Sequence, residues 1–407
     1  METETILSIR DLDVKFTLRG QVLHAIRGIS LDVHRGESLA IVGESGSGKS
    51  VFTKTFMGLL DSNGSVTAGE IRYNGQDLAG YTTDQQWRTI RGREIAMVMQ
   101  DPMTSLNPLK TIGDQIEEAI VLHQGLKGAE AHAQVLQVLE EVGIDQPERR
   151  SKQYPHEFSG GMRQRVVIAI AVACRPKILI CDEPTTALDV TIQAQILQLI
   201  KDLQKKYDLT TIYITHDLGV IAGVADDIVV MYAGRPVEKA DVDSIFDHPA
   251  MPYTMGLLGA VPRSDRERNS RLVPIPGSPM NLVNMPKGCP FAPRCPLATD
   301  ICHTTEPAME PVPGRPGQFV ACHRTQEIVD KGLTFHDVYT VAEAAKSKFA
   351  GIPRDERKMV LDVKHMRKTF PLTAGGFLRR KIGEVKAVDD VTLDVREGET
   401  VALVGES

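Results

Sequence analysis

The sequence predicts an α/β fold built on a parallel β-sheet with helices on both faces. Three short apolar runs rich in β-branched residues, at 38–43, 177–183 and 210–216, are typical of strands that are buried on both sides. Helical periodicity lies between them and is clearest at 111–142, where apolar residues recur at three- and four-residue spacings. This alternation of strands and helices is characteristic of a parallel sheet.

Composition and charge exclude several classes of protein. With 42% hydrophobic and 25% charged residues, the 407-residue chain is neither disordered nor fibrous, and its length predicts two or three domains. The net charge of −6 gives no electrostatic footprint for nucleic acid. The longest apolar run, 166–174, is far shorter than the roughly 20 residues of a membrane-spanning helix, and the first residues lack a secretory signal. We therefore expect a cytoplasmic protein that binds no nucleic acid.

An internal repeat determines the expected domain organisation. Residues 25–45 return as 387–407 with 11 of 21 positions identical, and residues 6–16 are echoed by 360–370. Self-similarity of this kind indicates two copies of one structural unit. The second copy stops at the VGES that precedes GSGKS in the first copy. We therefore expect one complete domain and an incomplete second copy, as in a fragment of a longer tandem protein.

Changes in composition divide the chain into four segments. We expect residues 1–242 to form the first domain. Residues 243–325 become rich in proline and lose periodicity, which indicates a loop-rich extension. Residues 326–356 are charged and contain alanine, which indicates a partly helical linker, and 357–407 begin the second copy.

The first chemical motif is GESGSGKS at 43–50, which follows a predicted strand and fits G-x-x-x-x-G-K-[ST]. Its glycines let backbone N–H groups close on phosphate oxygens, Lys49 would hold the β- and γ-phosphates, and Ser50 would bind Mg²⁺. The alternative is a plain glycine turn before a helix. The candidate nucleotide-binding residues are Gly43, Glu44, Ser45, Gly46, Ser47, Gly48, Lys49, Ser50 and Val51.

The second motif is the pair of acids that ends the apolar run ILICDE at 178–183. Asp182 would lie near the metal ion, and Glu183 could polarise an attacking water. An acidic cap at the end of a strand is the alternative, and the order of this pair after the glycine loop favours the catalytic interpretation.

The third motif, FSGGMRQR at 158–165, resembles the signature of ATP-binding cassette (ABC) transporter ATPases. A serine hydroxyl, two glycine amides and the start of a helix can face an anion, although a glycine pair before a helix is often only a turn. The resemblance implies that Ser159, Gly160, Gly161 and Met162 contact nucleotide. It also implies a P-loop NTPase with an ABC-type helical subdomain at about 101–165 and an N-terminal antiparallel β subdomain.

Four further roles are implied only by this resemblance. Gln100 matches a glutamine that touches metal and water, and His216 matches a histidine that contacts the γ-phosphate. Asp189, in TTALD at 185–189, belongs to a loop that crosses the dimer interface, and Phe16 matches an aromatic residue that stacks on adenine. The implied catalytic residues are therefore Glu183, His216 and Gln100, and the implied Mg²⁺ ligands are Ser50, Gln100 and Asp182.

Three segments narrow the resemblance to one group of importers. QDPMTSLNP at 100–108, KQYPHEFSGGM at 152–162 and HPAMPYTMGLLGAVP at 248–262 are similar to segments of the ATPases of oligopeptide, dipeptide, nickel and glutathione importers. The resemblance implies ATP hydrolysis coupled to solute import at the cytoplasmic face of the cell (inner) membrane. It implies as partners two transmembrane permease subunits, a second ATP-binding domain and, indirectly, a solute-binding protein. The solute itself cannot be identified from these residues.

Four of the six cysteines form a separate motif, Cys289-x5-Cys295-x6-Cys302-x19-Cys322. The spacing is not that of a zinc ribbon. Four thiolates could hold a [4Fe–4S] cluster, and the pattern is similar to one in dipeptide-importer ATPases. Unligated thiols and mixed ligation with His303 or His323 remain open as alternatives.

Two other kinds of protein compete with an importer ATPase. A soluble ABC ATPase that is not coupled to transport, acting in translation or DNA repair, would be expected to carry a basic patch or a long coiled-coil insertion. A regulatory module that had lost hydrolysis would be expected to have lost Lys49, Asp182, Glu183 or His216, and all four are present.

Overall fold

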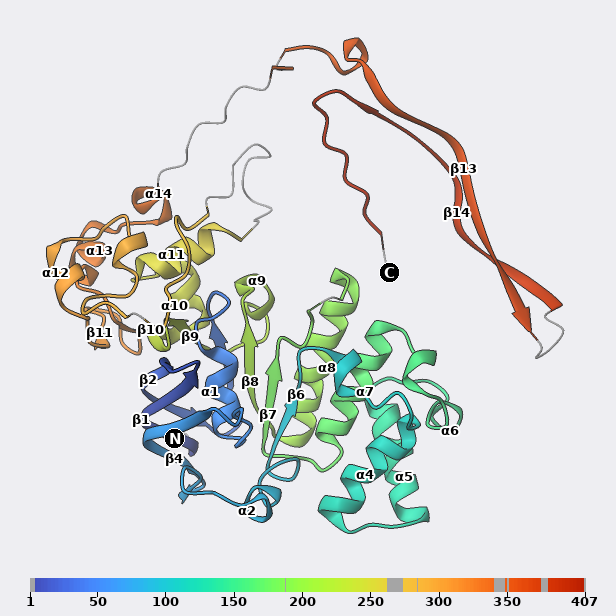
Figure 1. The fold of residues 1–407 in the computed structure, drawn as a ribbon, viewed down its shortest axis with the longest axis horizontal. Helices are drawn as coiled ribbons and strands as arrows, with labels where there is room; N and C mark the ends of the chain where they lie inside the picture. The colour runs from blue at the N-terminus through green and yellow to red at the C-terminus, as the bar shows by residue number, and fades with distance from the viewer. Residues whose placement is uncertain are drawn as a thin grey trace. The chain divides into compact units, whose positions relative to one another are not determined.

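The computed structural model describes residues 4–186, 188–261, 274–283, 285–339, 348–349, 351–374 and 380–405. Parts of the predicted extension, linker and second copy therefore lie outside the described residues, as does Ala187 of TTALD. The chain divides into two compact units, Met1–Val341 and Ala342–Ser407 (Figure 1). Among the described residues, no helix combines the length and apolar character needed to cross a bilayer.

The centre of the first unit is an eight-stranded sheet in the order β11-β12-β10-β9-β3-β8-β7-β6. Strands β9, β3, β8, β7 and β6 run parallel. The predicted strands are confirmed as β3, β7 and β8, and every residue of these three strands is buried. The strands span β3 Ser38–Val42, β6 Ile95–Val98, β7 Ile178–Asp182, β8 Thr210–Thr215, β9 Asp227–Tyr232, β10 Arg235–Asp241, β11 Glu310–Pro311 and β12 Phe319–Val320.

A second, antiparallel sheet covers one side of this core in the order β2-β1-β4-β5. Its strands are β1 Thr5–Leu18, β2 Gln21–His34, β4 Gly64–Tyr73 and β5 Gln76–Asp77. Apolar residues of this sheet pack with helix α1 (Lys49–Thr55) and one face of the parallel strands in a shared core. The short helix α2 (Asp84–Arg88) adds Trp87 to that core. The antiparallel β subdomain implied by the resemblance is therefore present.

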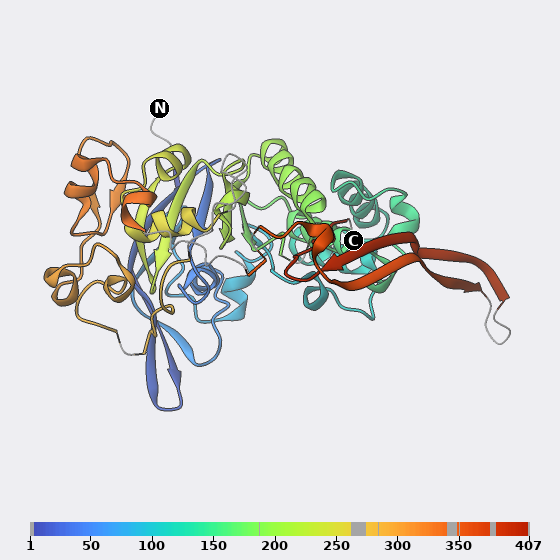
Figure 2. The ribbon, with the colours of Figure 1, turned by 90° about the horizontal axis from the view of Figure 1, so that it is seen from above.

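The opposite face is covered by helices (Figures 1 and 2), and their apolar residues form the second core cluster. The predicted helical stretch at 111–142 is confirmed as two helices, which break at Gly125 and Gly128. The second half of helix α7, at 166–172, carries apolar residues all round, as expected for a helix segment enclosed by others. The helices are α3 Pro102–Ser105, α4 Ile112–Gln124, α5 Ala129–Glu141, α6 Pro147–Arg150, η1 Pro155–Glu157, α7 Gly160–Val172, α8 Val190–Tyr207 and α9 Leu218–Ile221.

The extension is tied to the main sheet, because β12 pairs with β10 and β11 pairs with β12. Its remaining elements are α10 Val242–Asp247, α11 Pro252–Gly259, η2 Ala292–Arg294, α12 Asp300–Thr304, α13 Thr325–Lys331 and α14 Phe335–Val338. Helix α14 and all but the first residue of α13 fall within the segment expected to be a linker, 326–356. Both contribute to a small apolar cluster with Met255 of α11, and the Tyr339 hydroxyl donates to the Pro252 carbonyl at 2.8 Å.

The second unit contains the hairpin β13 (Met359–Ala374) and β14 (Arg380–Arg396), with a 3-10 turn η3 at Arg354–Glu356. It repeats an irregularity of β1 and β2. In the first unit Asp11 has a φ of 46° and its N–H donates to Ser30 Oγ at 3.0 Å. In the second unit His365 has a φ of 50° and its N–H donates to Thr392 Oγ1 at 3.0 Å. The sequence repeat is therefore also a structural repeat.

Candidate functional site

The predicted phosphate loop joins β3 to α1 and is wedged between neighbouring backbones. A Cβ on Gly43 would overlap the carbonyl oxygen of Met231 at the end of β9. A Cβ on Gly48, whose φ is 101°, would lie 2.8 Å from the carbonyl oxygen of Ala25 in β2. These two positions therefore require glycine, and the loop has a fixed path over the carboxyl end of the parallel strands.

Lys49 is the buried cation of this loop, with 6% of its surface exposed. Its ammonium donates to the carbonyl oxygens of Gly43 at 2.7 Å and Glu44 at 3.0 Å. Burial lowers its pKa, and the carboxylates of Glu183 and Asp182 oppose that shift. The loop thus folds around its own lysine, which lies where an anion would be held.

Asp182 ends β7 beside the first turn of α1. The Ser50 hydroxyl donates to Asp182 Oδ1 at 3.1 Å. Burial raises the pKa of Asp182, and the hydrogen bond from Ser50 works against that rise. A serine hydroxyl and a buried carboxylate next to a phosphate loop are oxygen ligands of the kind that Mg²⁺ prefers.

Glu183 is the centre of the candidate catalytic group. It has a φ of 47°, a conformation that is uncommon for a residue with a side chain and that is concentrated at active sites. Gln100 Nε2 donates to its carboxylate at 2.8 Å, Thr186 Oγ1 donates at 2.9 Å, and His216 Nδ1 lies 3.1 Å from it. Burial raises the pKa of Glu183, but the hydrogen bonds from His216 and Thr186 outweigh burial and hold the pKa below its usual value. The structure therefore brings together the three residues that the sequence marked as catalytic.

Thr186 was not singled out from the sequence. It lies in TTALD, and its hydroxyl donates to the same carboxylate oxygen of Glu183 that accepts from Gln100, whereas His216 meets the other oxygen. The sequence signal for this contact is the position of Thr186 three residues after Glu183, because a turn at this spacing brings the hydroxyl back to the carboxylate. The structure contains such a turn, in which the Thr186 N–H donates to the Glu183 carbonyl at 3.1 Å.

The signature residues lie on the helical side of the unit. Ser159 caps α7 and accepts a hydrogen bond from the Met162 N–H at 3.4 Å, while Gly160 and Gly161 form the first turn. Ser159 and Gly160 are exposed. Among the described residues, no hydrogen bond joins the signature to the phosphate loop, and Figures 1 and 2 show α7 well separated from α1. The signature does not complete the phosphate site of its own chain.

Asp189 and Phe16 have local structural roles in this chain. The Asp189 carboxylate caps α8 by accepting from the Ile192 N–H at 2.9 Å. The Phe16 ring is half-buried and lies against Gly64 across the β1–β4 pair. Their expected contacts with nucleotide stay predictions.

The extension contacts the phosphate loop through two residues that the sequence analysis missed. Arg294 donates to both carboxylate oxygens of Glu44, at 2.6 and 2.9 Å. The Tyr253 hydroxyl accepts from the Glu44 N–H at 2.8 Å. No local pattern could reveal these contacts, because more than two hundred positions of sequence separate each pair.

The four clustered cysteines converge from different parts of the extension, and all are free thiols. The Cys289 N–H donates to the Cys302 carbonyl at 2.8 Å. Burial, with a further contribution from neighbouring cysteines, raises the pKa of Cys295 to about 11 and that of Cys322 to about 12. Among the described residues, no three His, Cys, Asp or Glu side chains are close enough to hold a single metal ion.

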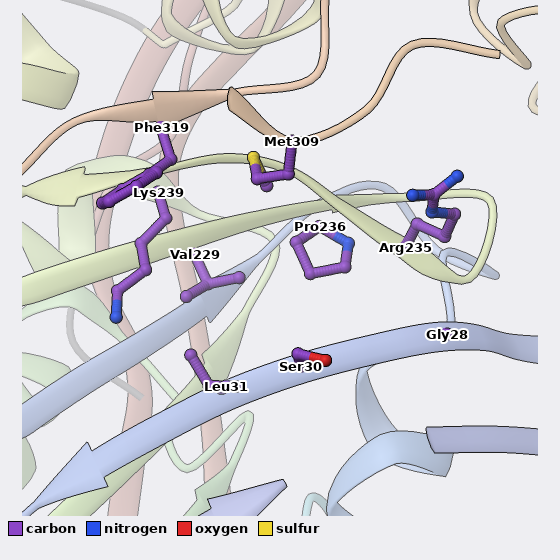
Figure 3. A pocket seen from close by; sticks show the side chains of 9 residues that line it. All are labelled: Gly28, Ser30, Leu31, Val229, Arg235, Pro236, Lys239, Met309 and Phe319. Carbon is purple, nitrogen blue, oxygen red and sulfur yellow. The ribbon is translucent and has the colours of Figure 1, made fainter. Parts of the chain in front are cut away.

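A separate cavity of about 290 Å³ opens between β2, β10 and the extension (Figure 3). Apolar side chains of Leu31, Val229, Pro236 and Phe319 line it. None of the residues of the candidate nucleotide site takes part in its lining.

Comparison with known proteins agrees with this arrangement. Residues 26–186 match the model of the family described as ABC transporter, and residues 237–302 match that of the oligopeptide/dipeptide transporter C-terminal region. The oligopeptide transport ATP-binding protein AmiE of Streptococcus pneumoniae is 54% identical over 300 residues, which cover 74% of this chain and 84% of that protein. The chain belongs to the ABC transporter family. The fold class predicted from the sequence is confirmed.

Two further relatives carry similar names. The dipeptide transport ATP-binding protein DppD of Bacillus subtilis is 52% identical over 305 residues, covering 75% of this chain and 90% of that protein. The oligopeptide transport ATP-binding protein OppD of Mycobacterium tuberculosis is 48% identical over 403 residues, covering 99% of this chain. The chain spans 64% of the length of the mycobacterial relative.

Solved structures of ABC cassettes share the fold. A bacterial ABC transporter cassette solved as a dimer is 27% identical, with a TM-score of 0.52, and the match covers 58% of this chain and 98% of that cassette. The same cassette was also solved in a post-hydrolysis state with ADP and Pi, and it matches at 26% identity with the same TM-score. Membership of this family implies that the site binds ATP.

Proposed function

We propose that this chain is the ATP-hydrolysing subunit of an ABC importer for oligopeptides, dipeptides or a related small solute. Its relatives are peptide transport ATP-binding proteins, and its extension matches the C-terminal region of oligopeptide/dipeptide transporters. That extension favours an importer subunit over a soluble ABC ATPase. We place the protein at the cytoplasmic face of the membrane, bound to permeases.

The observation that carries this proposal is the position of Glu183 between Gln100, Thr186 and His216, directly after Asp182. A carboxylate whose pKa is held low can accept a hydrogen bond from an attacking water and orient it. His216 would contact the γ-phosphate, and Gln100 would link the water to the metal. Catalysis in such a site is mostly positioning and charge stabilisation.

The same site fits Mg²⁺ bound together with ATP. Ser50, Asp182 and Gln100 would hold the ion, which would neutralise charge on the phosphate oxygens. The protein contributes few ligands, and this is usual for Mg²⁺, which takes its remaining ligands from water and substrate phosphates. The loop residues 43–51 would bind the phosphates, with Lys49 as the point charge, and Phe16 would stack on adenine.

A second ATP-binding domain is needed to complete the site. Ser159, Gly160, Gly161 and Met162 lie away from the phosphate loop of their own chain, and an exposed signature can serve only a loop that another domain brings to it. Val190, which follows Asp189 at the start of α8, leaves 82% of its surface exposed. These exposures support head-to-tail pairing with a second copy or with another ATPase chain.

The permease partners would contact the surface around Gln100 and α3. Met99, Met103 and Leu109 expose 46%, 63% and 86% of their surface there. Neighbouring exposed apolar side chains mark interaction sites in soluble proteins. Because Gln100 also bonds to Glu183, a permease seated on this surface would act directly on the catalytic carboxylate.

For the extension, we infer that Cys289, Cys295, Cys302 and Cys322 hold a [4Fe–4S] cluster. Four free thiols from separate segments form the ligand set that such a cluster uses. A single ion would need its ligands around one point, and that arrangement is not found among the described residues. The proposal therefore rests on the four free thiols and on their spacing in the sequence.

Reconstitution tests the proposed function. The chain, a second ATPase domain and the permeases encoded beside it would be placed in liposomes, with a panel of short peptides and the binding protein outside. We expect peptide uptake that requires ATP and that is abolished by Lys49→Ala, because that change removes the point charge on the phosphates. ATP hydrolysis that no permease or peptide stimulates would contradict the importer assignment.

A further inference from the structure

The strongest contact between the extension and the nucleotide site is the buried pair of Arg294 and Glu44. Arg294 exposes only 5% of its side chain, and its guanidinium meets the Glu44 carboxylate through two parallel hydrogen bonds of 2.6 and 2.9 Å. Bidentate arginine–carboxylate pairs fix geometry as well as supplying energy. Glu44 is the second residue of the phosphate loop, so this pair fixes the loop next to the glycine where it begins.

Arg294 is itself held firmly. Its Nε donates to the Pro276 carbonyl at 2.8 Å, and its Nη1 also donates to the Tyr232 hydroxyl at 3.3 Å. The planar guanidinium lies over the rings of Phe291 and Tyr232. Every part of the guanidinium therefore has a partner, so the side chain has little freedom to leave Glu44.

A second contact reaches the backbone of the same loop residue. Tyr253 of α11 is fully buried, and its hydroxyl accepts from the Glu44 N–H at 2.8 Å. Its ring packs with those of Tyr232 and Phe291, with centroids 4.7 and 5.2 Å apart. The carbonyl of Glu44 in turn accepts from the Lys49 ammonium at 3.0 Å. One residue of the loop thus connects the extension to the lysine of the phosphate site.

We propose that Arg294 and Tyr253 are positioning residues for ATP, and that the extension is a working part of the nucleotide site. By fixing Glu44, they hold the Glu44 and Gly43 carbonyls that orient Lys49 before nucleotide arrives. Preorganised groups bind more tightly because less ordering remains to be done on binding. This inference rests on the proposed nucleotide site and assigns part of its geometry to the extension.

A double-mutant cycle on the full chain tests the inference. Arg294→Gln and Glu44→Gln, singly and together, would be compared with the wild type for the dissociation constant of Mg²⁺–ATP and for KM and kcat. We expect each single change to raise the dissociation constant about tenfold and KM with it, with a smaller effect on kcat. The double variant should be no worse than either single variant, because the two changes remove one shared interaction.

Glu306→Gln is the matched control. Glu306 also joins the extension to the cassette, through ion pairs with Arg27 at 2.7 Å and Arg235 at 3.2 Å, but it does not touch the phosphate loop. If Arg294 only docks the extension, Glu306→Gln and Arg294→Gln should lower Tm alike and leave ATP affinity unchanged. That outcome, or fully additive losses in the cycle, would overturn the inference.

Two further measurements keep the test decisive. If Arg294→Gln does not fold, Arg294→Lys retains the charge without the bidentate geometry, and we expect it to weaken ATP binding measurably. In the wild type, Mg²⁺–ATP should slow amide hydrogen exchange at 289–295, because coupling between two sites is reciprocal. A wild type that binds no ATP would refute the proposed function, whereas equal ATP affinity in wild type and both Arg294 variants would refute this inference alone.

Discussion

Individual carboxyl groups in this protein have different environments, and their pKa values shift in different directions. Hydrogen-bond donors hold the pKa of Glu183 below its usual value, whereas burial raises the pKa of Asp182. Neighbouring acids whose pKa values are shifted in opposite directions are a common sign of divided catalytic roles. The two residues are adjacent in sequence, so the difference between their pKa shifts arises from their surroundings.

Glu183→Gln separates binding from hydrolysis. The amide keeps the size of the side chain and its hydrogen bond from Thr186, but it cannot act as a base toward water. We expect hydrolysis to fall at least about 100-fold while ATP still binds, which would trap a closed dimer. Single-turnover hydrolysis and size-exclusion chromatography with Mg²⁺–ATP measure the two effects. Turnover at the wild-type rate would show that Glu183 does not have this role.

Glu37 gives a prediction about pH. Glu37 lies between β2 and β3. One oxygen of its carboxyl group accepts from the His34 N–H at 2.7 Å, and the other oxygen is buried without a hydrogen-bond partner. Burial, with a contribution from Asp227, raises its pKa to about 7 from 4.5. Between pH 4.5 and 7, Glu37 therefore loses its proton in the unfolded state but keeps it in the folded state. The free energy of unfolding falls as pH rises through this range, because deprotonation favours the unfolded state.

Glu37→Gln should remove this dependence. The amide stays neutral and resembles the protonated carboxyl group, so the variant should match the wild type near pH 4.5 and be more stable above pH 7. The difference in free energy of unfolding should be on the order of 1–3 kcal/mol. Thermal denaturation of both proteins across this range measures it. A constant difference at every pH would show that Glu37 is not protonated in the folded state.

At the scale of elements, the sequence predicted those parts whose causes are local. Strands β3, β7 and β8 follow from unbroken apolar runs, and helices α4 and α5 from their periodicity. The phosphate loop could be predicted because its glycines occupy positions, such as Gly43 and Gly48, where a side chain would collide with neighbouring backbone. The grouping of Gln100, Glu183 and His216 follows because parallel strands β6, β7 and β8 end at the same edge of the sheet.

Other elements could not be predicted because their causes are distant in the sequence. Strands β11 and β12 are two residues each and exist only because β10 offers them an edge. Arg294 reaches Glu44 through the folding of the whole extension, and nothing in its neighbours marks it. Helices α13 and α14 are short and charged, so their own sequences do not predict them. They are positioned by packing against Met255, which is distant in the sequence.

The extension also gives a test of the proposed cluster. Protein purified without oxygen should be brown and should contain iron, and Cys295→Ser should lose both, because it removes one of four ligands. Cys174→Ser is the matched control, since Cys174 lies outside the extension and donates to the Ala119 carbonyl at 3.4 Å. Elemental analysis decides the question. Colourless, iron-free wild-type protein prepared in this way would contradict the assignment.

At the scale of the whole molecule, the two units differ in how well they are packed. The core of the first unit continues as far as Val338 and Tyr339, which expose 5% and 3% of their surface. In the second unit, most described residues of the hairpin are exposed. Among the described residues, a protease should therefore meet better-protected backbone at 325–339 than in the hairpin of the second unit.

Limited proteolysis should cut between the units. We expect cleavage after about residue 339 and a stable product that still binds Mg²⁺–ATP, because every proposed nucleotide ligand lies before that point. Mass spectrometry of the fragments and nucleotide binding by the product measure this. Early cleavage within 325–339 would show that this segment is not packed on the first unit. A resistant fragment from 351–405 would show that the hairpin is better packed than its exposure indicates.

The repeated hairpin also affects how the protein behaves at high concentration. Among the described residues, β13 and β14 pair only with each other, so each has an edge with unused N–H and C=O groups. The exposed apolar side chains along them include Val360, Leu361, Phe370 and Val385. Long, apolar strand edges readily join to those of other molecules. Preparations of this chain should therefore scatter light increasingly as they are concentrated, and lysine substitutions along β13 should keep them clear.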